Sequence, residues 1–118
     1  MQRRLRLRRA ADFRRLRETG SSHANRYLVL SVAPNDLSHN RYGIITTRRL
    51  GTAVARNRAR RRIREAIRHW HPLIAPGYDM VFIARQPAVH CAYPELLNAM
   101  QSLLQRAGLL GEDRSQAQ

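Results

Sequence analysis

The sequence predicts an α+β fold in which helices and a sheet form a two-layer sandwich, and the order of the predicted elements supports this. Three segments carry apolar residues at helical spacing: 10–19, 52–70 and 94–108. Three short segments have strand composition: 27–32, 41–47 and 78–84. We assign residues 1–110 to one domain with a single modest core, and residues 111–118 to a disordered polar tail.

The first helix follows a basic arm formed by residues 1–9, whose order the sequence leaves open. Ala10, Phe13 and Leu16 recur at three-residue spacing, which is typical of the buried side of a short helix. Gly20 is expected to end this helix in the left-handed conformation.

The first two strands are separated by Pro34-Asn35-Asp36, residues that break a strand. We expect the strand at 41–47 to lie antiparallel to the strand at 27–32 across this short connection. The sequence leaves open whether a further short strand precedes it.

The central helix is the most distinctive segment, because seven of its residues are arginines. Thr52 is a suitable N-cap, and His71-Pro72 ends the helix since the residue before a proline resists helical angles. The residues that share its apolar arc are Ala55, Ala59, Ile63, Ala66, Ile67 and Trp70. Arg56 falls near this arc within the first turns, so we expect it to point past the end of the packed surface.

The C-terminal half supplies one strand and one helix. The segment 78–84 is the most apolar strand of the chain and is expected to be central in the sheet. Pro94 suits the first turn of the last helix, and leucines at helical spacing continue up to Gly108.

The charge of the chain favours an anionic partner. The 22 basic residues, all of them arginine, oppose 8 acidic residues, which gives a net charge of +14. Such a charge favours nucleic acid or an anionic membrane surface. The apolar runs are too short to span a bilayer and the central helix is too polar to lie on one, so we expect no membrane partner. Without an apolar signal segment, the expected compartment is the cytoplasm.

No set of residues in the sequence predicts catalysis by the chain itself, a metal site or a small-molecule site. The acidic residues are scattered, and Glu65 lies among arginines as a salt-bridge partner. His69 and His71 lie near a helix end, where a structural or phosphate-contacting role is favoured over acid-base catalysis. Cys91 beside His90 is a weak nucleophile candidate, and a single cysteine allows neither an internal disulfide nor a zinc quartet.

The arginine face of the central helix predicts nucleic-acid binding. Its charges are almost all of one sign, and they continue in the N-terminal arm and at Arg48-Arg49. Asn57 adds a directional amide to this face. A DNA-binding helix is disfavoured, because base readout needs mixed donors and acceptors. A general structured-RNA-binding or ribosomal protein would have such a face, and this interpretation stays open.

Phe13 has two interpretations. Its position on a short helix over a small sheet favours a core side chain, whereas a partly exposed ring could stack on an unpaired base. The pattern alone favours the core.

One stretch of the sequence has a family resemblance. The segment 46–54, Thr-Thr-Arg-Arg-Leu-Gly-Thr-Ala-Val, is followed by Arg56-Asn57-Arg58, by Arg60-Arg61 and by Arg64-Glu65. This order resembles the signature of the bacterial ribonuclease P protein family. The match extends upstream through Asp12-Phe13 and downstream to the leucines of the last helix, so it covers residues from about 5 to 108.

The resemblance implies a fold and a function. The fold would be a four-stranded sheet with three helices, similar to the second domain of ribosomal protein S5, with a left-handed parallel crossover around the arginine helix. The protein would be the small subunit of ribonuclease P, the ribonucleoprotein endoribonuclease that removes the 5′ leader from precursor tRNA. The catalytic RNA subunit would carry the active site and hold the magnesium ions, so the protein alone would not be catalytic.

The resemblance also implies roles for individual residues. Those implied to contact the catalytic RNA are Arg48, Arg49, Arg56, Asn57, Arg58, Arg60, Arg61 and Arg64. Phe13 would line the cleft for the 5′ leader, which reverses the interpretation from pattern alone. Relatives carry an aromatic residue at the position of Arg17 and often another near Ser31, so the cleft of this chain would depend more on Arg17 and Tyr27.

Overall fold

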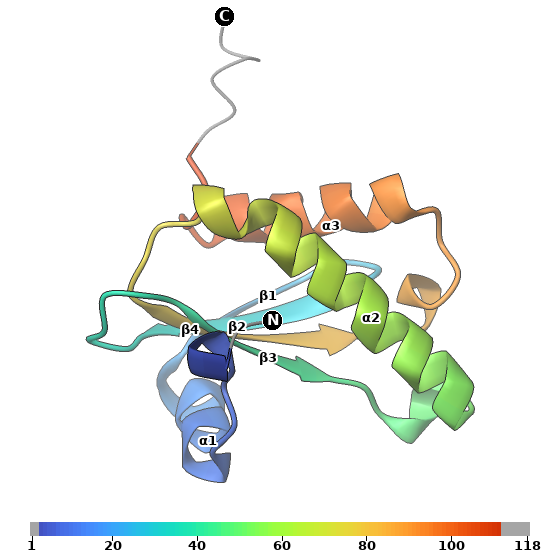
Figure 1. The fold of residues 1–118 in the computed structure, drawn as a ribbon, viewed down its shortest axis with the longest axis horizontal. Coiled ribbons are helices and arrows are strands. Elements are labelled where there is room, and N and C mark those ends of the chain that lie inside the picture. The colour runs from blue at the N-terminus through green and yellow to red at the C-terminus, as the bar shows by residue number, and fades with distance from the viewer. Residues whose placement is uncertain (1–2, 112–118) are drawn as a thin grey trace, which may run out of the picture.

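A four-stranded mixed sheet with the order β1-β2-β4-β3 forms the centre of the computed structural model, which describes residues 3–111 (Figure 1). The strands are β1 (Ser21–Ala24), β2 (Leu28–Pro34), β3 (Arg41–Ile45) and β4 (Tyr78–Ala84). The helices are α1 (Ala10–Thr19), α2 (Ala53–Trp70) and α3 (Tyr93–Arg106). The single-turn 3-10 helices are η1 (Arg3–Leu5), η2 (Arg48–Leu50), η3 (His71–Leu73) and η4 (Gln86–Ala88). The predicted α+β fold is confirmed; of the predicted tail at 111–118, all but Gly111 lies outside the described residues.

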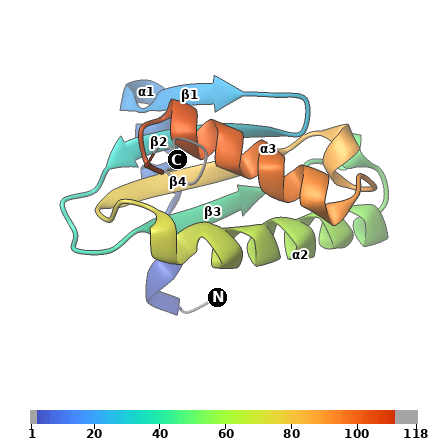
Figure 2. The same cartoon turned by 90° about the horizontal axis from the view of Figure 1, so that it is seen from above.

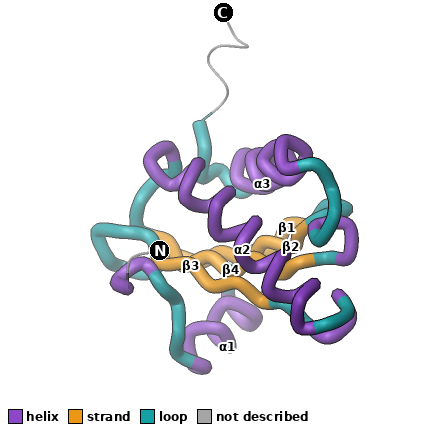
Figure 3. Tube along the Cα trace, turned by 45° about the vertical axis from the view of Figure 1, so that its right-hand side comes forward, coloured by secondary structure: helices purple, strands orange, loops and turns teal. Residues whose placement is uncertain are grey.

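The helices lie on both faces of the sheet (Figures 1 and 3). α2 and α3 cover one face, where they pack on apolar side chains such as Leu30 and Phe82. α1 lies on the opposite face, where Leu16 packs with Ala33 and Val81 in a smaller cluster. The sheet therefore forms a sandwich with α2 and α3, and α1 covers a part of its other face.

β4 is the central strand, as the sequence predicts. It pairs with β2 in antiparallel and with β3 in parallel orientation. β2 and β3 run in opposite directions as expected, but they do not pair with each other, because β4 lies between them. β4 is apolar on both faces, and the central position buries both faces under helices. This burial favours the central position for β4 more than the short connection favours direct pairing of β2 with β3.

The connection from β3 through α2 to β4 is a left-handed crossover. Figure 2 views the sheet from the side of α2 and α3, with β3 and β4 both pointing to the right and β4 above β3 on the page. The chain leaves β3, passes through α2 on the viewer's side of the sheet and enters β4. Seen along the strand direction from this side, β4 lies to the left of β3, so the crossover is left-handed, against the usual preference for such units. The sequence pattern could not predict this handedness, and only the family resemblance implied it.

The N-terminal arm lies along β3 from Arg3 onwards. The amide of Leu7 donates to the carbonyl of Tyr42 at 2.7 Å, and Arg6 forms a parallel bridge with the same residue. Leu5 packs into the core beneath α2, whereas Leu7 packs into the cluster beneath α1. The arm thus ties the two faces of the sheet together at its β3 edge.

Gly20 follows α1 as expected but for a different reason. Its φ of −81° is not left-handed. A Cβ at this position would lie 2.6 Å from the carbonyl oxygen of Leu16 and 2.8 Å from that of Val32. A glycine is therefore required by the close approach of two backbone segments where α1 turns into β1.

Candidate nucleic-acid interface

The helix α2 buries one side and presents its arginines on the others. The Thr52 hydroxyl caps its first turn by accepting a hydrogen bond from the amide of Ala55 at 3.2 Å. The predicted apolar arc is confirmed at its centre by four buried residues: Ala59, Ile63, Ala66 and Ile67. Trp70 is half-buried at the end of the helix, where its indole N–H donates to the carbonyl of Leu97.

Two predicted arginines on one flank of α2 are anchored towards β3 and η2. Arg56 donates to the carbonyl of Gly51 at 3.1 Å, so it points back past the start of the helix as expected. Arg60 donates to the Thr46 hydroxyl at 2.6 Å and to the side-chain oxygen of Asn57 at 3.3 Å. A guanidinium carries five N–H donors, so each of these groups keeps donors for a phosphate while its position is fixed.

The opposite flank of α2 is anchored to the loop before α3. Arg58 donates from Nε to the carbonyl of Val89 at 2.8 Å, and Arg62 donates to the same oxygen at 3.0 Å and to the carbonyl of Cys91. Arg62 was not among the predicted site residues. Its position four residues after Arg58 places both arginines on the same side of the helix and could have indicated a shared role. The carbonyls to which Arg62 donates are far away in the sequence and could not be predicted.

The outward side of α2 carries the most accessible groups. Asn57 and Arg61 are exposed, and Arg64 is half-exposed beside them. Arg48 and Arg49 in η2 are exposed just before the N-terminus of α2. Guanidinium groups bind phosphate oxygens bidentately, and the positive end of a helix dipole adds to the attraction. The eight residues predicted to bind RNA therefore belong to one continuous segment, which consists of η2 and the first twelve residues of α2.

Phe13 is neither a fully buried core residue nor a fully exposed ring, the two possibilities considered from the sequence. Its ring packs with the cluster under α1 and is partly buried. A Cβ on Gly43 would lie 2.9 Å from two ring atoms of Phe13, so the ring rests on β3 at a position without a side chain. One side of the ring is packed against β3, and the residue as a whole stays partly accessible.

A hollow of about 660 Å³ lies further along this face of the sheet. Its floor includes Val29 and Ile83, and Ile83 also packs in the cluster with Phe13. Arg49 and Arg85 line its side, and Arg85 is held by a 2.9 Å hydrogen bond to the carbonyl of Asn25. Apolar sheet surface flanked by arginines is suited to a single strand of nucleic acid, which needs contacts for bases and for phosphates. Arg85 was not among the residues predicted from the sequence, where it is an isolated arginine after a strand.

The two other predicted cleft residues differ in placement. Arg17 is exposed on α1 one turn after Phe13, so the two lie on the same side of that helix. Tyr27 lies on the other face of the sheet, where its hydroxyl donates to the Glu95 carboxylate of α3 at 2.8 Å. The structure therefore separates Tyr27 from the cleft under α1, because the chain turns just before β2 begins.

Asp79 is a buried carboxylate whose hydrogen-bond partners are all side chains of the protein. It is fully buried in β4 and accepts hydrogen bonds from Arg15 of α1, Arg41 of β3 and Asn35. The hydrogen bonds that Arg41 donates to Asp79, together with the charge of that carboxylate, raise the pKa of Arg41 above its ordinary value. All acceptor capacity of this carboxylate faces protein donors, so it has none left for a metal ion.

The remaining candidates for chemistry carry no catalytic arrangement. Burial raises the pKa of the Cys91 thiol, which works against an activated thiolate. His90 is exposed, and Glu65 forms a 3.3 Å ion pair with Arg68 as expected. Among residues 3–111, no three or more His, Cys, Asp or Glu side chains are grouped so that they could hold a metal ion. In the same range no helix is long and apolar enough to cross a membrane.

Tyr42, which is buried, and His71, which is partly buried, form a pair beneath the end of α2. The Tyr42 hydroxyl lies 2.7 Å from Nδ1 of His71, and burial raises the pKa of Tyr42 to about 12. Burial and then the charges of Arg4 and His39 lower the pKa of His71. The folded chain therefore binds fewer protons at His71 than the unfolded chain does, so the stability contributed by this site is lost as the pH falls.

We expect His71→Gln to reduce the pH dependence of the free energy of unfolding. The folded-state pKa is lowered, so the contribution of His71 is complete above its unfolded pKa of about 6.5 and decreases below it. Urea unfolding at about pH 7.5 and about pH 5.5 measures the difference. His69→Gln, on the exposed side of the same helix end, is the matched control. Identical pH dependence in both variants would contradict this assignment.

Comparisons with known proteins agree on one family. Residues 1–108 match the ribonuclease P family. The ribonuclease P protein component of Roseiflexus castenholzii is 50% identical over 111 residues, which cover 93% of this chain and 91% of that protein. That of Herpetosiphon aurantiacus is 46% identical over 116 residues, which cover 98% of this chain and 94% of that protein.

Solved structures show the same arrangement. The ribonuclease P protein of Staphylococcus aureus superimposes with a TM-score of 0.81 at 34% identity, covering 91% of this chain and 98% of that one. The Thermotoga maritima ribonuclease P protein gives a TM-score of 0.78 at 30% identity, covering 86% of this chain and 96% of that one.

Proposed function

The chain belongs to the ribonuclease P protein family, and from this premise we propose how it divides its surface between two RNAs. As a ribonuclease P protein component it takes part in an endoribonuclease and has an RNA partner. The exposed side of α2, together with η2, binds the catalytic RNA subunit. The sheet face beside α1 holds the 5′ leader of precursor tRNA.

The preorganised arginines of α2 support the first assignment. Arg58 and Arg60 are each tied to the protein by one edge of the guanidinium, which fixes the group without using all its donors. Held groups lose less conformational entropy on binding than free ones do. This fixed row of charges is the observation that carries the proposal, because a merely solvated face would not need it.

The surface beside α1 supports the second assignment. Phe13 and Ile83 belong to one apolar cluster, and the hollow that shares Ile83 is bordered by Arg49 and Arg85. A single strand could place bases against the apolar floor and phosphates against these arginines. Arg49 lies where both surfaces meet, so the leader would reach the RNA subunit at η2.

The cleavage itself is assigned to the RNA subunit. Magnesium prefers oxygen ligands in near-octahedral geometry, and the buried Asp79 carboxylate is occupied by arginine and asparagine donors. The Asp79 carboxylate thus does not fit a magnesium site, and we assign the ion to the RNA. The protein neutralises phosphates, orients the leader and acts in the cytoplasm, where tRNA precursors are made.

Reconstitution tests this function. The RNA-free protein is combined with a bacterial ribonuclease P RNA and a precursor tRNA at a magnesium concentration too low for the RNA alone. We expect removal of the 5′ leader only in the mixture, because the protein replaces cations at the phosphates. Tight binding of ribosomal RNA without rescue of the ribonuclease P RNA would instead indicate a general RNA-binding protein.

Arg61→Ala is expected to weaken binding to the ribonuclease P RNA and to reduce the salt dependence of log K by about one unit, because one phosphate contact is removed. Arg61 has no hydrogen-bond partner among residues 3–111, and it is exposed on the outward side of α2. Filter binding over a range of salt concentrations measures the slope. Arg106→Ala removes the same charge from the end of α3 and should leave the slope unchanged. Equal slopes for both variants would place the interface elsewhere.

A further inference from the structure

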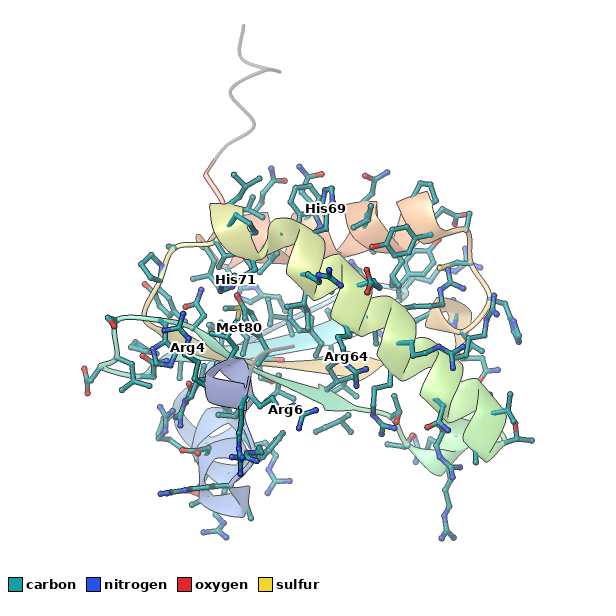
Figure 4. All side chains as sticks on the ribbon, viewed as in Figure 1. Arg4, Arg6, Arg64, His69, His71 and Met80 are labelled. Atoms are coloured by element: carbon teal, nitrogen blue, oxygen red, sulfur yellow. The ribbon has the colours of Figure 1, made fainter. Side chains whose placement is uncertain are left out.

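A second pocket lies between η1 and the C-terminal half of α2, away from the hollow beside α1. Its volume is about 350 Å³, within the range of about 300–1,000 Å³ typical of ligand pockets. Arg4 comes from η1 and Arg64 from α2, and His71 follows at the helix end (Figure 4). The pocket therefore exists only because the N-terminal arm folds back along β3.

The rim of this pocket is positively charged. Arg4, Arg64 and Arg68 line it together with a single acidic residue, Glu65. The Glu65 carboxylate is paired with Arg68 at 3.3 Å, and together Arg64 and Arg68 exceed Glu65 by one positive charge. A group with one negative charge, such as a phosphodiester, matches the excess.

The inner part of the pocket is apolar and ends in one polar group. Leu5 and Ile67 are almost completely buried and form its wall. The Tyr42 hydroxyl accepts a hydrogen bond from Asn40 at 3.4 Å and lies 2.7 Å from Nδ1 of His71, to which we assign the hydroxyl hydrogen because Asn40 already donates to the oxygen. A neutral His71 then carries its hydrogen on Nε2, which gives the pocket a fixed donor.

We propose that this pocket receives one unpaired nucleotide of the RNA partner. The phosphate lies against the arginines of the rim, the base lies against Leu5 and Ile67, and His71 donates to an acceptor of the base or sugar. A free phosphate would leave the apolar wall without a contact, and a base pair of double-stranded RNA would be too large for the pocket. A single nucleotide has both a phosphate for the rim and a base for the wall. The proposal rests on the proposed function and extends the RNA contact from the start of α2 to its end.

NMR spectra that follow the histidine ring signals of the full chain test whether the pocket prefers a nucleotide to a sugar phosphate. Adenosine 5′-monophosphate is titrated as the probe, with ribose 5-phosphate as the probe that lacks a base. We expect saturable shifts of the His71 ring signals with the nucleotide and about tenfold weaker binding of the sugar phosphate. His69 lies outside the pocket on the same helix end and should not respond. Equal affinities for the two probes would reduce the site to a phosphate contact and overturn the proposal.

A matched pair of variants tests the rim. Arg68→Gln should weaken nucleotide binding about tenfold, since a charged hydrogen bond is lost, whereas Arg106→Gln on α3 should have no effect. Both side chains are exposed, so neither change should impair folding. Equal weakening by both variants would show that the probe responds to net charge only, against the proposal.

Competition with RNA identifies the source of the nucleotide. Ribonuclease P RNA should displace adenosine 5′-monophosphate from the His71 site and produce its own shift there. Nucleotide binding that persists in the complex would mean that the pocket takes a free nucleotide, and the proposal would be wrong. Processing of precursor tRNA is measured on the same samples, because active complexes without a His71 shift refute this pocket and leave the proposed function standing.

Discussion

Replacing Asp79 with asparagine is expected to destabilise the fold by about 3 kcal/mol, the lower end of the range for breaking a buried ion pair. Asp79 is completely buried, and its two oxygens accept from Arg15 and Arg41 at 2.5 to 2.9 Å. Asparagine keeps the shape but removes the charge and turns an N–H₂ group towards guanidinium donors. The lower end applies because Arg15 and Arg41 are partly exposed and can be rehydrated.

The loss should be visible in urea unfolding, and it should loosen α1 first, because Arg15 is the polar link between α1 and β4. Asp12→Asn is the matched control. Its carboxylate lies 3.6 Å from Arg41 and is partly exposed, so we expect less than about 1 kcal/mol. Similar losses for both variants would mean that Asp79 is not the anchor of this helix.

Phe13→Ala is expected to weaken binding of precursor tRNA by the reconstituted particle about tenfold or more, since stacking on one base contributes about 1–3 kcal/mol. Mature tRNA lacks the leader and should bind almost as well as before. The difference between the two ligands separates a leader contact from a general loss of structure.

The packing of Phe13 requires its own control. The ring is partly buried against Gly43 and the cluster under α1, so the variant will also lose some stability. Leu16→Ala removes a fully buried side chain from the same helix and cluster without an accessible ring. We expect it to destabilise the fold and to leave the ratio of precursor to mature tRNA affinity unchanged. If Phe13→Ala weakened both tRNAs equally, Phe13 would be a core residue only.

The helices could be predicted from the sequence because their signals are local. The spacing of Ala59, Ile63 and Ala66 fixes the buried side of α2, and the Thr52 hydroxyl caps its first turn as expected. The pairing of the strands could not be predicted in this way. The place of β4 between β2 and β3 depends on the burial of both its faces, which no local pattern encodes.

The candidate site was predictable in its charge and less so in its geometry. The run of arginines in α2 and η2 was evident from the sequence, and the resemblance selected eight residues of this face. Contacts such as that of Arg62 with Cys91, and the pocket shared by Arg4 and His71, join segments far apart in the chain. Tyr27 shows the reverse error, since its hydroxyl turns to Glu95 on the other face of the sheet.

The structure of the particle assembled from this chain, a ribonuclease P RNA and precursor tRNA is the most direct test of the proposed function. We expect Asn57, Arg61 and Arg64 to lie against phosphates of the ribonuclease P RNA, and the leader to cross the sheet face beside Phe13. We also expect the scissile phosphate to be contacted by RNA and magnesium. An α2 helix that faces solvent, or a side chain of this protein at the scissile phosphate, would contradict the proposed function.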